Sequence, residues 1–407
     1  GLDALESQLP KDHILFHDTE VSITGCEAMY AVDLDALTLK KICTAIEDAT
    51  PLGRLFDMDV INIDSKKMDR ETVGANSRGC IVCSAPGRAC SAGRLHTVPQ
   101  LQAATLEIIT QHFAVKDRQY LASLAVQSLK DEVNTTPKPG LVDCRNNGSH
   151  TDMTRSTFLD SANALESYFQ ECVEIGQKTC HISPTETFTL LRRAGIAAEA
   201  VMYRTTGGVN THKGIIYTMG VLCGSLGRLW KPERPVADAH AVLTECARMT
   251  EDSVTSDFSA ISNSSLSTPT AGQLLYQQLG LTGIRGEVAA GLPSIANIGL
   301  PEYQQALLSG LSTNDAGAVT LLHLIAKVKD TNLYHRGGKE GASYAATAAQ
   351  NLLNQPQPPS TKQIEDLDDA FIAKNLSPGG CADLLAVTYF LHRLTASTPP
   401  SPSCVFI

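Results

Sequence analysis

Aromatic residues make up only 5% of the 407-residue sequence, and Trp230 is its single tryptophan. This shortage argues against a protein that binds single-stranded nucleic acid, because such proteins stack bases on aromatic rings. Positive charge is also in deficit: 33 Lys and Arg residues face 43 Asp and Glu residues, for a net charge of −10. An acidic chain has no general attraction for nucleic acid, although a local basic pocket for phosphates is compatible with it. We therefore expect no nucleic-acid partner.

Long apolar runs are absent too. No segment is apolar over the length of a membrane span, and no secretory signal is visible, so the sequence predicts a cytoplasmic protein without a membrane partner. Its twelve cysteines are scattered, which in a long chain without a secretory signal is typical of reduced thiols. The chain begins at Gly1 rather than at a methionine, inside what reads as an amphipathic helix, so we expect a truncated N-terminus.

The length of 407 residues favours two domains. Strand and helix signals mix in the first part of the chain. Val21–Leu34 has a β-like composition, Ala36–Asp48 has a helical period, Leu55–Ile63 alternates like a strand, and a helix is expected from about Pro99 to His112. The patterns after about Lys116 are helical and rich in alanine and leucine.

The predicted fold class is therefore a small α+β domain followed by a large all-α helical domain. The expected boundaries are residues 1–112, residues 117–394 and a disordered tail over residues 395–407, which is rich in Pro, Ser and Thr. The helices expected in the all-α domain are Asp117–Leu129, Arg155–Gly176, Glu186–Tyr203, Ile215–Trp230, Ala237–Met249, Gly286–Ile298, Asn314–Lys327, Lys339–Asn354, Lys362–Ala373 and Cys381–Leu394.

Polar stretches that contain glycine precede several expected helix starts. They are Thr136–Gly140, Asn146–Asp152, Gly207–Gly214, Arg285–Glu287, Arg336–Gly338 and Ser377–Gly380. A helix N-terminus offers free N–H groups and a partial positive charge, which suit phosphate, and glycine lets a ligand approach the backbone. Any one stretch alone is better explained as an ordinary capped helix end, but several of them converging would form a polyphosphate pocket.

These stretches, in this order, resemble the motifs of the triphosphoribosyl-dephospho-CoA synthase family. The resemblance covers residues 117–394 and is carried by Glu132–Asp143, Gly207–Gly214, Arg285–Glu287, Asp330–Asn332 with Arg336–Gly338, and Leu376–Gly380 with Asp383. It implies that ATP and dephospho-CoA give triphosphoribosyl-dephospho-CoA and adenine. In that reaction a ribose hydroxyl of dephospho-CoA attacks the anomeric carbon of the ATP ribose, and the triphosphate is retained.

The candidate residues follow from this chemistry. A base helps the attacking hydroxyl, an acid helps adenine leave, and a carboxylate stabilises an oxocarbenium-like transition state. The catalytic candidates are Glu132, Asp143, Asp152, His150, His212, Glu287 and Asp383. The triphosphate needs Mg²⁺ with cationic side chains. The nucleotide-binding candidates are Lys138, Gly207, Gly208, Asn210, Lys213, Arg285, Asp330, Arg336, Ser377, Gly379 and Gly380. The pattern does not decide which carboxylate binds metal and which acts on the sugar.

Asp57 and Asp59 are two apart on the strand expected over Leu55–Ile63, which would place both carboxylates on one face, about 6–7 Å apart. Such a pair can share Mg²⁺ and position a triphosphate. Their setting, Pro51–Val60, together with Arg78–Cys83, resembles the apo-citrate lyase phosphoribosyl-dephospho-CoA transferase family over residues 1–112.

This second resemblance implies a nucleotidyltransferase-like domain. Its reaction transfers the nucleotide group to a serine of the citrate lyase acyl carrier (gamma) subunit and releases pyrophosphate. The family has a further N-terminal portion that this chain lacks, so we expect the domain to be incomplete.

Four potential metal ligands crowd into one loop of the small domain. They are Cys80, Cys83, Cys90 and His96. Three thiolates and an imidazole are a zinc ligand set, but the spacings after the Cys-x₂-Cys pair are looser than in standard zinc modules. A structural zinc and a cluster of buried thiols are both compatible with the pattern.

Three functions compete at this point. The first is a fused synthase and transferase, the second a non-catalytic regulator that binds a nucleotide or CoA, and the third a helical glycohydrolase that frees adenine. Release of adenine from ATP separates the two enzymes from the regulator. Dependence of that release on dephospho-CoA separates the synthase from the glycohydrolase.

Overall fold

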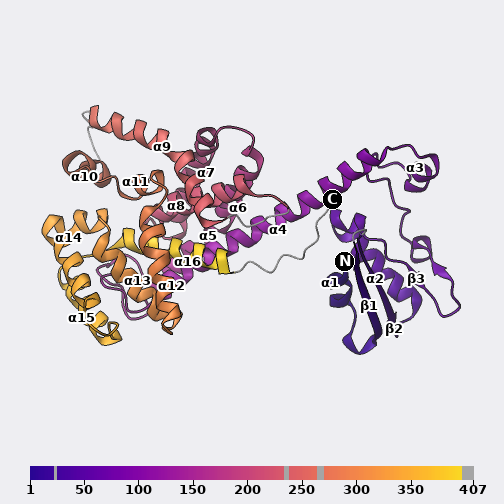
Figure 1. Ribbon diagram of the computed structural model, residues 1–407, viewed down its shortest axis with the longest axis horizontal. Coiled ribbons are helices and arrows are strands. Elements are labelled where there is room, and N and C mark those ends of the chain that lie inside the picture. Colours follow the sequence, from indigo (N-terminus) through magenta and orange to yellow (C-terminus); the bar gives the residue numbers. More distant parts are fainter. Residues whose placement is uncertain (23–24, 233–237, 264–269, 397–407) are drawn as a thin grey trace. The chain divides into compact units, whose positions relative to one another are not determined.

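The structure is a computed structural model that describes residues 1–22, 25–232, 238–263 and 270–396. It divides into two compact units, the first comprising Gly1–Lys116 and the second beginning at Asp117 (Figure 1). The disordered tail expected at residues 395–407 was placed too early, because Thr395 and Ala396 belong to the last helix. The remainder of that tail lies outside the described residues.

The first unit combines short helices with two small sheets. Its elements are α1 (Leu2–Gln8), η1 (Lys11–His13), β1 (Ile14–Ser22), β2 (Gly25–Val32), α2 (Ala36–Ala49), η2 (Pro51–Leu55), β3 (Val60–Ile61), β4 (Lys67–Met68), η3 (Arg70–Val73) and α3 (Gly87–Gly93). β1 pairs antiparallel with β2, and β3 with β4. The α+β content predicted from the sequence is confirmed.

The core of the first unit is small. It is centred on Leu5, Leu9, Cys43, Ile46 and Val60. Helix α2 begins where predicted because the carboxylate of Asp35 accepts hydrogen bonds from the first-turn amides of Leu37 and Thr38.

The strand expected over Leu55–Ile63 is wrong for most of its length, since only Val60 and Ile61 belong to a strand. Side chains of α2, rather than a neighbouring strand, hold this backbone. The amide of Met58 donates to Glu47 (2.8 Å), and its carbonyl accepts from the Lys40 ammonium (3.0 Å). Asp57 and Asp59 therefore lie in irregular backbone that precedes β3.

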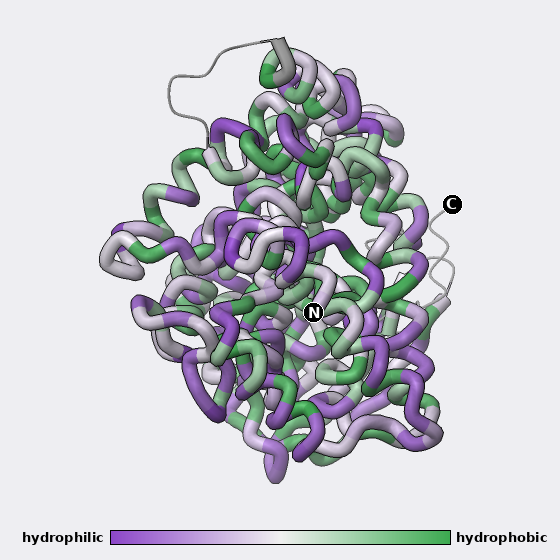
Figure 2. The backbone as a smooth tube through the Cα atoms, turned by 90° about the vertical axis from the view of Figure 1, so that its left-hand side faces the viewer, coloured by the Kyte–Doolittle hydropathy of each residue, from purple (hydrophilic) through white to green (hydrophobic). Residues whose placement is uncertain are grey.

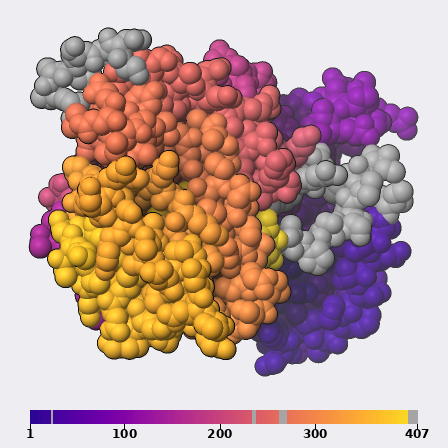
Figure 3. Space-filling model, turned by 60° about the vertical axis from the view of Figure 1, so that its left-hand side comes forward, coloured from indigo at the N-terminus to yellow at the C-terminus, as the bar shows by residue number. Residues whose placement is uncertain are grey.

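The described part of the second unit is helical, as predicted. Its elements are the part of α4 (Val98–Asn134) from Asp117 onward, α5 (Arg155–Ala164), α6 (Glu166–Thr179), α7 (Pro184–Thr205), α8 (Lys213–Leu229), α9 (Ala239–Asn263), α10 (Ala271–Leu279), α11 (Gly283–Ala289), the π-helical turn η4 (Ile295–Gly299), α12 (Leu300–Leu308), α13 (Thr313–Lys327), α14 (Thr331–Leu353), α15 (Thr361–Ala373) and α16 (Gly379–Ala396). Hydrophobic and hydrophilic residues are interspersed along the chain (Figure 2). The described residues from about 300 onward, coloured orange to yellow, lie together on the face that Figure 3 shows.

Helices α8 and α16 lie at the centre of the core, with most of their side chains buried. Glycines bring α8 very close to α6. A Cβ on Gly176 would lie 2.1 Å from the carbonyl oxygen of Gly224, and one on Gly227 would lie 2.1 Å from that of Val173. The two backbones therefore touch directly, which fixes the position of α8.

Several helix boundaries differ from the predictions. The helices expected at Pro99–His112 and Asp117–Leu129 are one helix, α4, because no breaker lies between them. The helix expected over Arg155–Gly176 divides at Leu165, and that expected over Gly286–Ile298 divides into α11 and η4. Helices α10 and α12 were not predicted.

Two of the glycine stretches lie inside helices instead of before them. Arg285–Glu287 is within α11. Arg336–Gly338 is within α14, where Gly338 breaks the helical backbone with φ 64° and ψ −164°. That conformation is open to glycine and strained for other residues. No helix in the described residues has the length and apolar character needed to cross a membrane.

Candidate functional site

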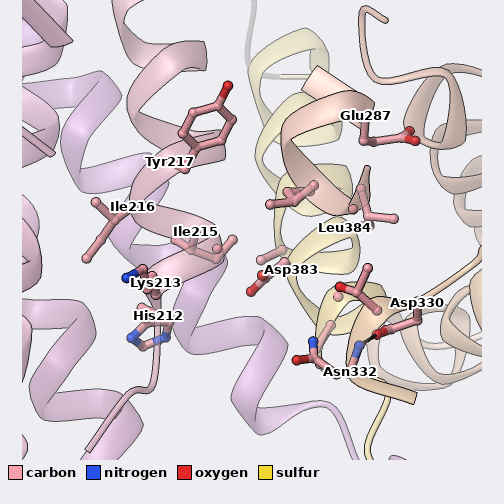
Figure 4. A pocket seen from close by; sticks show the side chains of 18 of the residues that line it. His212, Lys213, Ile215, Ile216, Tyr217, Glu287, Asp330, Asn332, Asp383 and Leu384 are labelled. Carbon is pink, nitrogen blue, oxygen red and sulfur yellow. Dashed lines mark hydrogen bonds between the residues drawn. The ribbon is translucent and has the colours of Figure 1, made fainter. Parts of the chain in front are cut away.

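A cavity of about 930 Å³ lies in the second unit, between the start of α8, α11, the start of α14 and the start of α16 (Figure 4). Most of the residues predicted for the synthase site line it. They are Glu132, Lys138, His150, Asn210, His212, Lys213, Arg285, Glu287, Asp330, Arg336, Ser377, Gly379, Gly380 and Asp383. Side chains from segments far apart in the sequence thus meet around one cavity.

Four predicted residues do not line the cavity. Asp143 is buried and accepts hydrogen bonds from the amides of Lys138, Arg145 and Asn146, so it shapes the loop that carries Lys138. Asp152 is exposed, with its carboxylate 4.0 Å from Nδ1 of His150. The two glycines, Gly207 and Gly208, adopt positive φ angles of 66° and 95° in the turn after α7.

Glu132 and Lys138 form a buried ion pair at the cavity wall. The Lys138 ammonium donates to the Glu132 carboxylate and, at 2.8 Å, to its main-chain carbonyl, and the lysine side chain is 1% exposed. Burial raises the pKa of Glu132, while the charge of Lys138 opposes this rise. Lys138 thus already has a protein anion as its partner.

Asp330 holds the starts of two helices together. One of its carboxylate oxygens accepts from the amides of Asn332 (2.7 Å) and Leu333 at the start of α14. The other accepts from the amide of Cys381 at the start of α16 (2.8 Å). Burial raises its pKa, and these amide bonds act against the rise.

Asp383 differs from the other carboxylates of the cavity. Glu132 is bound by Lys138, Glu287 accepts from the amide of Ser294 (2.6 Å), Asp330 binds the amides above, and Glu199 pairs with Lys213 (3.0 Å). Within the part of the chain that the structure describes, the Asp383 carboxylate has no such partner.

The carboxylate of Asp383 points from α16 toward the start of α8 (Figure 4). Burial, together with the charges of Glu132 and Asp330, raises its pKa well above the usual value. A carboxyl with a raised pKa and no such partner is well suited to take part in proton transfer.

The pKa values of both predicted histidines are lowered, which favours their neutral form. Burial, with the charge of Lys138, lowers the pKa of His212 to about 3, and Nδ1 of this ring lies 2.8 Å from the Ser161 hydroxyl. Burial and the charge of Arg336 also lower the pKa of His150. Because Arg336 donates to Nδ1 of His150, Nε2 carries the proton and donates to the Ser377 hydroxyl (2.9 Å).

Besides Lys138, two more of the predicted cations at the cavity already pair with protein carboxylates. The Lys213 ammonium is 3.0 Å from Glu199, and its side chain is 55% exposed. Arg285 pairs with Asp257, which also binds Arg192. A polyphosphate would compete with these exposed or half-exposed pairs at small cost, since such pairs contribute about 0–1 kcal/mol.

The sequence prediction missed several residues of this wall. Lys329 lines the cavity and forms no ion pair within the described residues. Glu199, Arg192 and Asn332 also line it. Glu199 and Arg192 lie on helix α7, outside every glycine stretch, so only the packing of α7 against α8 reveals them.

A carboxylate behind the wall was also missed. Asp368 accepts from the amide of Gly140 (2.8 Å), from Arg145 (2.6 Å) and from the Asn146 amide group (2.7 Å). It therefore fixes the loop that carries Lys138. Its place in the regular pattern of α15 gave no sign of this.

In the first unit, Asp57 and Asp59 are both exposed, and Met58 between them is less so. The alternation places both carboxylates on the solvent side, although the segment is not a strand. Asp59 pairs with Lys67 (2.6 Å), both side chains being about half exposed. Because buried side chains of α2 anchor Met58 on both sides, the two carboxylates stand on fixed backbone.

The predicted cysteine and histidine ligands come together in the first unit. The thiol sulfurs of Cys80, Cys83 and Cys90 and a ring nitrogen of His96 all lie within 4.8 Å of one another. Hydrogen bonds from the amides of Val82 and Cys83 lower the pKa of Cys80. The hydrogen bond to Cys83, with burial, raises the pKa of Cys90 to about 11.

Comparison with known proteins matches the two parts of the chain to two families. Residues 118–401 match the family described as ATP:dephospho-CoA triphosphoribosyl transferase. Residues 1–112 match the family described as apo-citrate lyase phosphoribosyl-dephospho-CoA transferase. No solved structure matches the chain.

Two relatives span most of the chain. Protein CitXG of Haemophilus influenzae is 35% identical over 380 residues, which cover 90% of this chain and 79% of the relative. A protein of Citrobacter koseri, named probable 2-(5''-triphosphoribosyl)-3'-dephosphocoenzyme-A synthase, is 41% identical over 280 residues. That alignment covers 67% of this chain and 90% of the relative.

A helical unit with a polar cavity and a smaller α+β unit, each matching a transferase family, define a fusion of two transferases. The chain belongs to the ATP:dephospho-CoA triphosphoribosyl transferase family, and its first part belongs to the apo-citrate lyase phosphoribosyl-dephospho-CoA transferase family. Both resemblances seen in the sequence are confirmed.

Proposed function

We propose that the cavity of the second unit is the place where ATP and dephospho-CoA react, and that Asp383 is the catalytic base. The overall activity follows from family membership: the chain makes the precursor of the citrate lyase prosthetic group and transfers that group to the lyase carrier protein. The observation that carries the assignment is the unpartnered carboxylate of Asp383, which faces the start of α8 inside the cavity.

The proposed step is a substitution at the anomeric carbon of the ATP ribose. The hydroxyl of dephospho-CoA gives its proton to Asp383 as its oxygen bonds to that carbon. The bond from the carbon to adenine breaks, and its electron pair leaves with adenine, which then takes up a proton. Because its pKa is raised, the Asp383 carboxylate is a stronger base than an ordinary aspartate and removes a proton more effectively.

The triphosphate is assigned to the starts of α8 and α16. Lys213 and Gly214 begin the first of these helices, Gly379 and Gly380 begin the second, and all four line the cavity. Free amides at a helix start and a nearby ammonium favour an anion. Lys329 and Arg336 add further positive charge to the wall.

The remaining predicted residues take supporting roles. The Glu132–Lys138 pair and Asp330 form the acidic part of the cavity wall. Asp330 also holds the start of α14 against the start of α16. The Arg336–His150–Ser377 chain of hydrogen bonds orients the Ser377 hydroxyl at the start of α16. His212, whose pKa is about 3, acts as a neutral hydrogen-bonding ring and not as a proton donor.

Two metals complete the proposal. Mg²⁺ would neutralise the charge of the triphosphate, and in the nucleotidyltransferase-like first unit Asp57 and Asp59 would hold it. Zinc is assigned to Cys80, Cys83, Cys90 and His96. Dephospho-CoA and the carrier subunit of citrate lyase are the proposed substrates of the two units.

The test of the cavity assignment is adenine release by Asp383→Asn in the presence of ATP and dephospho-CoA. We expect a loss of about a thousandfold, within the range that a general base supplies, with ATP binding retained. Asp160→Asn, at an exposed position of α5, is the matched control and should act normally. Adenine release at the wild-type rate by Asp383→Asn would remove the catalytic role of this residue.

A further inference from the structure

Three cysteines and a histidine of the first unit have the arrangement of a metal site. Nε2 of His96 is 3.2 Å from the sulfur of Cys83, which is 3.5 Å from the sulfur of Cys90. With bonds of about 2.3 Å to sulfur and 2.1 Å to nitrogen, a tetrahedral zinc ion places neighbouring ligand atoms about 3.5–3.8 Å apart. These two distances are therefore close to what zinc requires, and the sulfur of Cys80 lies within 4.8 Å of the other three ligand atoms.

A disulfide explains this grouping less well. A sulfur–sulfur bond is about 2.0 Å long, and the three cysteines are free thiols. A disulfide would also use only two of the three sulfurs, and it would give His96 no role. The amide of Val82 points at the sulfur of Cys80 (3.4 Å), which is the kind of outer contact that stabilises a metal-bound thiolate.

The segment that carries these residues has almost no core of its own. From Ile61 to Thr97, all of which the structure describes, the side chain of Cys90 is the only buried one. The segment contains only short elements, among them β4, η3 and α3. Chain of this kind buries too little apolar surface to hold one conformation and is usually stabilised by disulfides or a metal.

The residues just before Cys80 connect the cluster to the Asp57–Asp59 segment. Arg78 lies 2.8 Å from the carboxylate of Glu47, and Arg54 donates to the carbonyl of Gly79. The same Glu47 accepts the amide of Met58. One buried carboxylate thus joins the cysteine loop to the backbone between the two aspartates.

We propose that Cys80, Cys83, Cys90 and His96 bind one zinc ion, and that this ion holds the cysteine loop in the position that braces the Asp57–Asp59 segment. The bracing role rests on the proposed function of Asp57 and Asp59. The zinc site itself does not depend on that function. The ion is structural, because protein ligands fill all four of its positions.

The first test measures the metal content of the whole chain after it has been purified and dialysed against a solution that contains zinc. The wild-type protein is expected to hold one equivalent of zinc by elemental analysis. Cobalt put in its place should give the visible absorption of a tetrahedral thiolate site. Cys83→Ser and His96→Ala should lose the metal, and Cys26→Ser, which removes an exposed cysteine of β2, should retain it. Metal-free wild-type protein, or full zinc in Cys83→Ser, would overturn the site.

The second test measures hydrogen exchange of the Met58 amide, which donates to Glu47, with and without zinc. Removal of zinc by a chelator should speed this exchange about tenfold or more, in line with loss of local structure, and zinc should restore it. Unchanged exchange would overturn the bracing role.

A third protein separates this inference from the proposed function. Asp57→Asn should keep its zinc and its slow Met58 exchange while losing carrier labelling. Loss of zinc from Asp57→Asn would contradict the assignment of four separate ligands.

Discussion

Gly214, in the first turn of α8, lies directly against the carboxylate of Asp383. A Cβ built on this glycine would be 1.9 Å from Oδ2 of the aspartate, far closer than two non-bonded atoms can approach. The glycine is therefore required for the carboxylate to reach the start of α8. This contact joins two of the motifs that the sequence showed as separate stretches.

Gly214→Ala should displace Asp383 and lower adenine release about tenfold or more, because small displacements of a reacting group are costly. Gly272→Ala is the matched control. Gly272 is likewise the second residue of its helix, α10, and a Cβ there meets nothing within 4 Å. Steady-state rates of both variants, with their circular dichroism spectra, give the comparison. Equal rates in the two variants would show that the contact has no catalytic consequence.

Asp383→Asn should make the protein more stable while it loses activity, because the buried charge is removed. Burial and neighbouring acids raise the folded pKa of Asp383, so the folded state binds this proton more tightly than the unfolded state. That contribution is present below the unfolded pKa and is lost as pH rises through the folded pKa.

The stability advantage of Asp383→Asn over wild type should therefore grow between about pH 5 and pH 8. At the upper end we expect a melting temperature higher by about 2–4 °C, the shift that 1 kcal/mol gives in a domain of this size. Thermal unfolding of both proteins over this pH range measures the effect. The prediction is contradicted if the variant melts at a lower temperature than wild type. It is also contradicted if the difference in melting temperature is the same at every pH.

Lys213→Ala should reduce the use of ATP about a hundredfold, because a charged hydrogen bond to phosphate contributes roughly 2–4 kcal/mol. Lys213→Arg should rescue poorly, since a guanidinium fork does not replace a compact ammonium beside Gly214. Lys178→Ala is the control, because Lys178 also forms an exposed ion pair on a helix, with Glu174 at 2.8 Å. A change in melting temperature without a kinetic defect in Lys213→Ala would exclude the phosphate contact.

Asp57→Asn and Asp59→Asn should each abolish labelling of the carrier subunit and leave adenine release intact. Because the two proposed sites lie in different units, loss of carrier labelling should leave adenine release unchanged. Because one relative is longer than this chain, labelling is best measured with the same substitutions in that longer relative as well. Asp64→Asn, an exposed aspartate in the turn between β3 and β4, is the control. Normal labelling in both site variants would refute the assignment of these aspartates.

The sequence predicted those parts of the fold that local rules determine. Helices such as α13 and α15 begin close to the predicted positions because Ser312 and Ser360 cap them and an apolar period follows. It also predicted most of the cavity, because the motif order brought the right residues together. The strand at Asp57 was wrong, because side chains of α2 took the hydrogen bonds that a neighbouring strand would have made.

Partners from other helices could not be predicted. Nothing local to Glu199 shows that it meets Lys213, or that Asp330 joins the starts of α14 and α16. The distinct position of Asp383 appears only when the partners of the other cavity carboxylates are known. Spacing along the chain identifies candidate residues, whereas packing decides which of them are already engaged.

The most direct test of the account is chromatography of ATP incubated with the purified chain and Mg²⁺, with and without dephospho-CoA. We predict that adenine appears only when dephospho-CoA is present, in equal amount to a product whose mass is that of triphosphoribosyl-dephospho-CoA. Adenine release without dephospho-CoA would instead indicate a glycohydrolase. No release under either condition would contradict the synthase assignment.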